Sequence, residues 1–322
     1  MANIAAIGLS IVAIVAFSGC LGQVQPKSQI CSLSGCSMDQ DTNNQIHDSN
    51  NNPNAKAEDN NIEKEKNHDS ILLEKVAPTQ GAILPAKWSN VLVKAVEAGA
   101  IDMNKYKESL KRGGAELTKG HEKLLLEGSD GNISFTPENA YFNLNMLWAL
   151  GLVNENPILA KGKISGYGAK KAHFASTGGW NLGKKSGGEL LASAKIIKLT
   201  PTQQKIVEEV AESTYRPCCS NPTGFPDCNH GMAALALAEL MASQGATKDQ
   251  IYDALRIANS YWFTQNYLGI AQYLDENGKD FSKMDSKELL DYDYSSQNGF
   301  SKIANSLKYA PKIRVVGSTC AN

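Results

Sequence analysis

The chain has 322 residues, of which 42% are hydrophobic and 20% are charged, and its formal net charge is −1. This length suffices for one large or two modest domains with ample apolar surface to bury. A nearly neutral chain lacks the basic face that non-specific nucleic-acid binding needs, so we expect no nucleic-acid partner.

The first twenty residues indicate export. Residues 5–19 form an uncharged, mostly apolar run that leads into Cys20. The run is shorter than the roughly 20 residues that span a bilayer, and it fits the hydrophobic region of a signal peptide. Ser-Gly-Cys after an apolar residue resembles a lipobox, which predicts a signal peptide over residues 1–19 and lipidation of Cys20. The first five residues lack Lys and Arg, and the alternative is an uncleaved short anchor. Either way, we expect an extracytoplasmic protein that is anchored to the membrane.

Residues 20–70 have the composition of a flexible tether. Residues 37–70 are rich in Asn, Asp, Glu and Lys, and such a segment buries too little apolar surface to offset the entropy lost on ordering. His47 and His68 are therefore interpreted as solvated. Cys31 and Cys36 are close enough in sequence to close a small disulfide loop. We expect the globular domain over residues 71–322.

The remainder of the chain shows mainly helical patterns. Apolar spacing, capping residues and breakers predict a single α-rich domain of about seven or eight helices. The expected helices cover approximately residues 85–98, 103–111, 116–126, 137–152, 201–213, 230–245 and 248–274, and residues 286–290 and 301–307 are expected to add short helical turns. Residues 194–199 and 312–316 are expected to form a small two-stranded sheet.

Residues 161–190 are interrupted by glycines and are expected to form a long irregular segment. Such a segment in a compact domain is usually functional or disordered. The run Ser176-Thr-Gly-Gly-Trp180 lacks the spacing of a phosphate-binding loop. His173 in this segment is expected to be packed or exposed, and it is the best candidate for an additional metal ligand from a distant loop.

The stretch from Tyr215 to Gly245 concentrates the chemistry of the chain. Cys218, Cys219, Cys228 and His230 lie on a loop that also holds three prolines, which fix φ and lower the entropy cost of ordering the loop. An almost purely apolar run follows, in which Glu239 is the one charged residue. A helix that is apolar nearly all round is a buried helix. A stiff, sulfur-rich loop is therefore expected to lead into a central helix.

The cysteine loop has three interpretations, which the sequence leaves open. In an oxidising compartment, Cys218, Cys219, Cys228 and Cys320 are expected to form disulfides, and the function would then be ligand or partner binding. Alternatively, three thiolates and an imidazole suit Zn²⁺ or Cu⁺, with Cys218, Cys219, Cys228 and His230 as ligands.

The third interpretation is an extracytoplasmic thiol or redox enzyme. Cys228 precedes a buried helix, whose positive end lowers the pKa of a thiol. His230 would then act as the base and Asp227 would orient it, as an activated nucleophile requires. Of the three, we take metal binding as the main hypothesis.

The loop motif also carries a resemblance. Arg216-Pro-Cys-Cys-Ser-Asn-Pro-Thr-Gly-Phe-Pro-Asp-Cys-Asn-His-Gly-Met232, preceded by Phe174-Ala-Ser-Thr-Gly-Gly-Trp180, resembles a set of uncharacterised bacterial and archaeal secreted proteins or lipoproteins. The resemblance covers roughly residues 84–274. It implies that the loop and the glycine-rich segment belong to one domain, and it brings no activity, cofactor or catalytic residue with it.

Overall fold

Helix α10, Asn229–Ser243, is the buried centre of the fold. The structure is a computed structural model that describes the backbone of residues 53–311 and the side chains of residues 64–311. In it, α10 contacts α5 (Ala140–Val153), α9 (Pro201–Ser213) and α11 (Lys248–Trp262). Every residue of α10 from His230 to Ala242 is buried. The sequence-based expectation of a buried central helix is confirmed.

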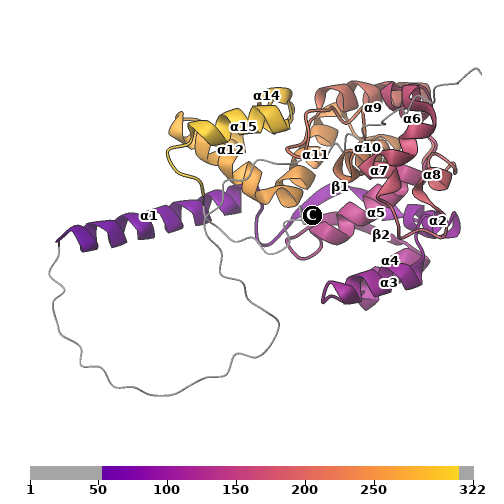
Figure 1. Ribbon diagram of the computed structural model, residues 1–322, viewed down its shortest axis with the longest axis horizontal. Coiled ribbons are helices and arrows are strands. Elements are labelled where there is room, and N and C mark those ends of the chain that lie inside the picture. Colours follow the sequence, from indigo (N-terminus) through magenta and orange to yellow (C-terminus); the bar gives the residue numbers. More distant parts are fainter. Residues whose placement is uncertain (1–52, 312–322) are drawn as a thin grey trace, which may run out of the picture. The chain divides into compact units, whose positions relative to one another are not determined.

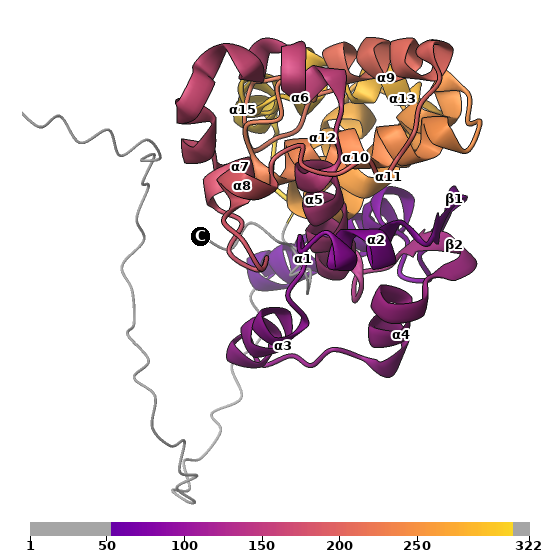
Figure 2. The ribbon, with the colours of Figure 1, turned by 90° about the vertical axis from the view of Figure 1, so that its right-hand side faces the viewer.

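The other elements surround this core (Figure 1). Helix α9 covers one side of α5 and α10, and α3 and α4 lie on the opposite side (Figure 2). The remaining elements are α1 Pro53–Val76, β1 Ala82–Ser89, α2 Val91–Glu97, α3 Met103–Arg112, α4 Lys119–Glu127, β2 Ser129–Phe135, α6 Pro157–Lys161, η1 Lys163–His173, α7 Ala175–Gly178, α8 Gly187–Leu190, α12 Thr264–Glu276, η2 Phe281–Lys283, α13 Ser286–Leu289, α14 Tyr292–Ser295 and α15 Gln297–Ser306. The predicted class, mainly α with one small sheet, is confirmed. The helices outnumber the seven or eight expected, because the sequence pattern does not reveal the short helical turns.

Capping residues fix where several helices begin. Thr200 and Gln203 form a capping box at the start of α9, and Thr247 and Gln250 form another at the start of α11. In both, the threonine side chain accepts from the third helical N–H and the glutamine side chain accepts from the threonine N–H, which satisfies two otherwise unpaired donors. These helix starts match the sequence prediction.

The helix predicted from Pro85 is wrong at its start. Residues 82–89 are strand β1, which pairs antiparallel with β2 through Ala82 opposite Phe135 and Lys87 opposite Asn132. Buried Leu84, Ala86 and Trp88 alternate with exposed neighbours, which is the two-residue period of a strand. Helix α2 starts only at Val91.

The sheet expected from residues 194–199 and 312–316 is not the one observed. Ala194 forms an isolated parallel bridge to Asn154, outside any strand, and residues 312–316 lie outside the described part of the chain. The glycine-rich segment 161–190 was expected to be a long irregular loop, but it holds the short helices η1, α7 and α8 joined by turns.

The boundary of the predicted tether also differs. Helix α1 begins at Pro53, so residues 53–70 are helical, and residues 20–52 lie outside the described part. Leu72 and Val76 of α1 are buried against the core. His68 was expected to be solvated, but it is half-buried, with Nδ1 2.9 Å from the Tyr309 hydroxyl and Nε2 3.1 Å from an Asp275 carboxylate oxygen.

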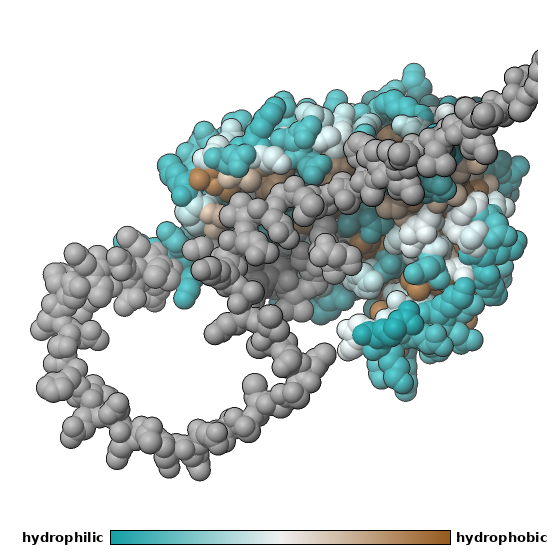
Figure 3. Space-filling view, viewed as in Figure 1, coloured by the Kyte–Doolittle hydropathy of each residue, from teal (hydrophilic) through white to brown (hydrophobic). Residues whose placement is uncertain are grey.

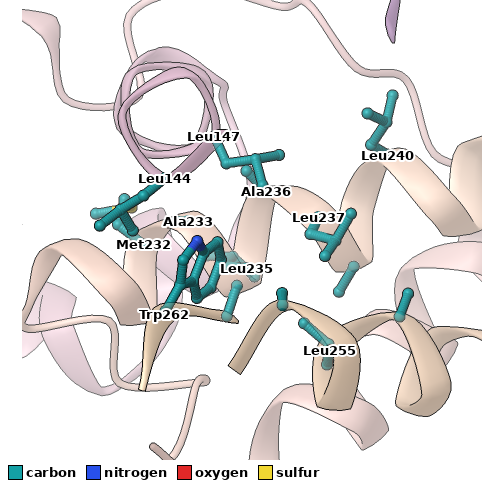
Figure 4. Close-up of a cluster of buried hydrophobic side chains, with 14 of the residues drawn as sticks. Leu144, Leu147, Met232, Ala233, Leu235, Ala236, Leu237, Leu240, Leu255 and Trp262 are labelled. Carbon is teal, nitrogen blue, oxygen red and sulfur yellow. The ribbon is translucent and has the colours of Figure 1, made fainter. Parts of the chain in front are cut away.

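Helices α5 and α10 pack against each other in the core (Figure 4). Leu144 and Leu147 of α5 face Met232 and Ala236 of α10. Gly151 permits this approach, because a Cβ at that position would overlap the Met232 carbonyl oxygen. Hydrophilic residues cover the rim of the face in Figure 3, and hydrophobic residues gather toward its middle.

One carboxyl group lies inside this core. Glu239 of α10 is fully buried and accepts a hydrogen bond from the Asn154 side-chain amide at 2.7 Å. The side-chain oxygen of Asn154, Oδ1, in turn accepts hydrogen bonds from the backbone N–H groups of Ile196 and Ile197 at 3.0 and 2.8 Å. Glu239 and Asn154 together fasten the segment after α8 to the central helix. Burial raises the pKa of Glu239 to about 8, although the Asn154 hydrogen bond opposes the shift.

This raised pKa makes stability depend on pH with a defined sign. In the unfolded chain Glu239 loses its proton near its ordinary pKa, whereas the folded protein retains the proton up to about pH 8. The free energy of unfolding should therefore fall as pH rises from about 5 to about 8, by at most about 1.4 kcal/mol per pH unit. Glu239→Gln should be less sensitive to pH over this window. Urea denaturation of both proteins at several pH values measures the difference, and parallel pH profiles would contradict the assignment.

Candidate metal centre

The cysteine loop connects α9 to α10 and ends on the sulfur of Cys228. Cys228 is the N-cap residue of α10, and its Sγ accepts a hydrogen bond from the Gly231 N–H at 3.3 Å. The sulfur thus occupies the positive end of a 15-residue helix, where negative charge is stabilised. The prediction that Cys228 precedes the central helix is confirmed.

The three cysteines of the loop are free thiols. The Sγ atoms of Cys218 and Cys228 lie 3.5 Å apart, whereas a disulfide bond is about 2.05 Å long. The interpretation of these residues as disulfide staples has no support among the described cysteines. Cys20, Cys31, Cys36 and Cys320 lie outside the described residues, as does His47.

His230 in the first turn of α10 completes a cluster of metal-ligating atoms. One ligand atom each of Cys218, Cys228 and His230 lies within 4.8 Å of the others. The imidazole is only 3% exposed and packs against the Phe263 ring, with 4.3 Å between ring centroids. Neither ring nitrogen meets the geometry of a hydrogen bond, although the His230 side chain interacts with Cys228 and contributes to lowering the pKa of that thiol. Buried polar atoms are almost always paired, so this imidazole is available to bind a metal ion or a water molecule.

Cys219 belongs to a second group, which shares Cys228 with the first. Its Sγ lies 3.9 Å from an Asp227 carboxylate oxygen, and Cys219, Asp227 and Cys228 also place their ligand atoms within 4.8 Å of one another. The four predicted ligands are therefore neighbours that form two overlapping groups. Asp227, which the sequence analysis had not considered as a ligand, joins the second.

A buried arginine holds the loop together. Arg216 is 1% exposed, and its Nε donates to Cys228 Sγ at 3.0 Å. Its two terminal nitrogens donate to the Asn221 carbonyl at 2.9 Å, the Phe225 carbonyl at 3.3 Å and the Asp227 carboxylate at 2.6 Å. Gly231 leaves room for this side chain, because a Cβ there would overlap the guanidinium.

The electrostatics of the cluster favour one thiolate, on Cys228. Hydrogen bonds from Cys218 and Cys219, assisted by the charge of Arg216, hold the pKa of Cys228 well below its usual range. The same hydrogen bonds, together with burial, raise the pKa of Cys218. A hydrogen bond with Cys218 lowers the pKa of Cys219, but the Cys228 thiolate and burial outweigh it and raise that pKa to about 11.

The pKa of the Arg216 guanidinium shifts in the opposite direction to that of Cys228. Burial alone would lower the pKa of Arg216, but the negative charge of Cys228, with Cys219 and Cys218, outweighs it and raises the pKa. Arg216 therefore carries a permanent positive charge beside the sulfur atoms.

Two sequence-based assignments differ from the structure. His173, the suggested additional ligand, is exposed and belongs to neither group of possible metal ligands. Asp227 does not orient His230, because its carboxylate accepts from Arg216 and from the Asn221 side-chain amide at 2.7 Å. Sequence reasoning did not single out Arg216, and the only available signal was a lone arginine within a loop rich in proline and cysteine.

Comparisons with protein families, with curated proteins and with solved structures each found no match to this chain. Along the described residues, no helix combines the length and the apolar character needed to cross a membrane.

The network around Arg216 predicts a large loss of stability when the guanidinium is removed. Arg216→Met should lower the free energy of unfolding of the reduced, metal-free protein by roughly 3–5 kcal/mol, because Cys228 Sγ, one oxygen of Asp227 and two half-buried carbonyl groups lose the donor that Arg216 supplies. As a control, Lys163→Met removes an exposed ion pair with Glu212 and should cost less than about 1 kcal/mol. Urea denaturation measures both variants, and equal losses would show that Arg216 does not hold the loop.

Proposed function

We propose that this protein is an extracytoplasmic lipoprotein, anchored through Cys20, whose cysteine loop binds a thiophilic metal ion. The observation that carries the proposal is the buried imidazole of His230, whose ring nitrogens do not meet the geometry of a hydrogen bond, beside the thiols of Cys218 and Cys228. A metal ion bonded to one ring nitrogen and both sulfurs would satisfy the imidazole. Two thiolates and an imidazole are a donor set that suits Zn²⁺ or Cu⁺.

Location supports the same proposal. The apolar run before Cys20 predicts export to an oxidising compartment. Two thiols whose sulfur atoms are 3.5 Å apart would be oxidised there unless something protected them. A bound metal ion holds thiolates apart and reduced, which reconciles free cysteines with an exported protein.

The charge of the buried groups favours Zn²⁺ over Cu⁺. Arg216 and Asp227 form an ion pair and offset one another. Bound as thiolates, Cys218 and Cys228 carry two negative charges, which a divalent ion neutralises and a monovalent ion does not. Uncompensated charge is costly in a buried site. With Cys219, which lies beside Cys228, as a third thiolate ligand, the net charge is −1 with a divalent ion and −2 with a monovalent ion, so the preference for a divalent ion holds.

A redox function is the second candidate, and one observation favours it. Cys228 Sγ accepts hydrogen bonds from Arg216 and Gly231, with Cys218 Sγ 3.5 Å away as a resolving thiol. In such a reaction the Cys228 thiolate attacks a substrate disulfide and releases one thiol. Cys218 then displaces the second thiol and forms the Cys218–Cys228 disulfide, so the protein is oxidised and the substrate is reduced.

Metal binding predicts a defined stoichiometry and a defined pattern of variants. The reduced full chain should bind one Zn²⁺, and chelation should lower its melting temperature, because a ligand that binds only the folded state stabilises it. Cys218→Ser and His230→Gln should each weaken Zn²⁺ binding by about 100-fold or more, since second-shell changes alone cost about 10- to 100-fold.

The matched control is Ser220→Ala, which changes the same loop without removing a ligand and should alter the affinity less than about threefold. Competition with a zinc-sensitive dye measures all four proteins. A metal-to-protein ratio near zero, or unchanged affinity in His230→Gln, would contradict metal binding.

The redox candidate makes a separate prediction. In oxidised glutathione, the metal-free protein should lose two hydrogens by forming the Cys218–Cys228 disulfide. Its reduction potential should be higher than about −300 mV, the range of labile rather than structural disulfides. Intact-mass measurements across glutathione buffers test this, with Cys219→Ser as the control that retains the pair. Thiols that stay reduced in oxidised glutathione would exclude the redox function.

A further inference from the structure

One segment of the chain carries a concentrated positive charge. Residues 161–198 contain eight lysines and a single acidic residue, Glu189, although the whole chain has a net charge of −1. Lys163 pairs with Glu212 at 2.6 Å and Lys195 pairs with Glu155 at 3.6 Å. Within the described part of the chain, the other six make no ion pair, namely Lys161, Lys170, Lys171, Lys184, Lys185 and Lys198.

A pocket lies within this basic segment. It has a volume of about 560 Å³ and is formed where the end of η1 meets α7 and α8, which lie side by side (Figures 1 and 2). Lys184 and Lys185 line it from the turn before α8, and Lys105 of α3 lines it from the other side. The Lys105 ammonium is held in place, because it donates to the Gly183 carbonyl at 2.8 Å.

The only carboxylate lining the pocket is already occupied. Glu189 accepts from the Ser186 hydroxyl at 2.6 Å and from the Ser186 N–H at 3.1 Å, as part of the capping box of α8. It therefore faces Ser186 and holds the turn that carries Lys184 and Lys185. Three ammonium groups against one carboxylate leave the pocket with a net charge of +2.

The shape of the pocket depends on small residues. Gly187 lets α8 lie against α7, because a Cβ there would overlap the Thr177 carbonyl. Gly178 and Gly188 also line the pocket without side chains. Beneath them Trp180 is 2% exposed, and its indole N–H donates to the Ala100 carbonyl at 2.8 Å. The lysines therefore lie around a pocket whose other lining includes closely packed glycines and the buried Trp180.

We propose that this pocket binds a phosphate-bearing anion. Lysine ammonium groups are compact point charges that suit polyvalent oxyanions, and clustered positive charge raises the local concentration of such anions. The pocket's net charge matches a dianionic phosphate group. The site is independent of the proposed metal function, because it shares no residue with the cysteine cluster.

Inorganic pyrophosphate is the probe for the pocket. Titration calorimetry with the full chain at low ionic strength should detect binding that weakens steeply as salt is added. Replacing Lys184 and Lys185 together with Gln should weaken binding by about tenfold or more, since two charges near the ligand are lost. The matched control replaces Lys195 and Lys198 with Gln, which removes the same charge outside the pocket lining and should change the affinity less than about twofold.

Vesicles distinguish the source of the phosphate group. Binding of the full chain is compared between vesicles of phosphatidylglycerol and vesicles of phosphatidylcholine. Insertion of the apolar N-terminal run contributes to binding in both cases, so the difference between them measures the binding that depends on lipid charge. If the pocket variant loses this difference and the control retains it, the ligand is a lipid headgroup. If only pyrophosphate binding shows that pattern, the ligand is soluble. Absence of both kinds of binding, or equal losses in the two double variants, would overturn the proposal, provided that circular dichroism shows both variants to be folded.

Discussion

The cysteine loop depends on a single buried cation. Every nitrogen of the Arg216 guanidinium donates a hydrogen bond, and its partners are the Cys228 sulfur, a carboxylate and two backbone carbonyls, all in the loop or at the helix start that follows it. Burying an arginine is costly unless all its donors are paired, so the loop is wrapped around this side chain. The same contacts place Cys228 at the start of α10 and turn Asp227 away from His230. The prolines limit the unfolded states of the loop, but the arginine selects its folded shape.

Helix α10 transmits this local order to the rest of the domain. Cys228 caps its start and His230 lies in its first turn, and Glu239, about two and a half turns further along the helix, is tied through Asn154 to the chain after α8. Both polar features lie on a helix that is otherwise apolar and packed on all sides. A rigid helix therefore fixes the distance between the sulfur cluster and the segment that leads back to the basic pocket.

The sequence predicts the helices that carry clear caps and the buried helix after the loop, because apolar period and capping chemistry are local signals. The sequence prediction mistakes β1 for a helix, because the spacing of Trp88 and Leu92 also fits a helix. The alternation of Leu84, Ala86 and Trp88 fits the strand that is observed. The sequence prediction identifies the cysteines and His230 as neighbours but cannot show that they form two overlapping groups. The role of Arg216 is hidden because nothing in a sequence shows that a charged side chain is buried. That depends on partners such as the Asn221 and Phe225 carbonyls, which become available only in the folded loop.

The sulfur cluster and the basic pocket lie in one continuous piece of structure. The Ser176 N–H in α7 donates to the Asp227 carbonyl at 3.1 Å, and the Phe174 ring before α7 packs edge-on against Phe225 of the cysteine loop. The other side of α7 contributes Gly178 to the pocket. The segment around α7 therefore contacts the cysteine loop and also lines the basic pocket. The glycine-rich segment is thus a structural partner of the cysteine loop, which explains why two stretches far apart in sequence, each unusual in composition, occur in the same chain.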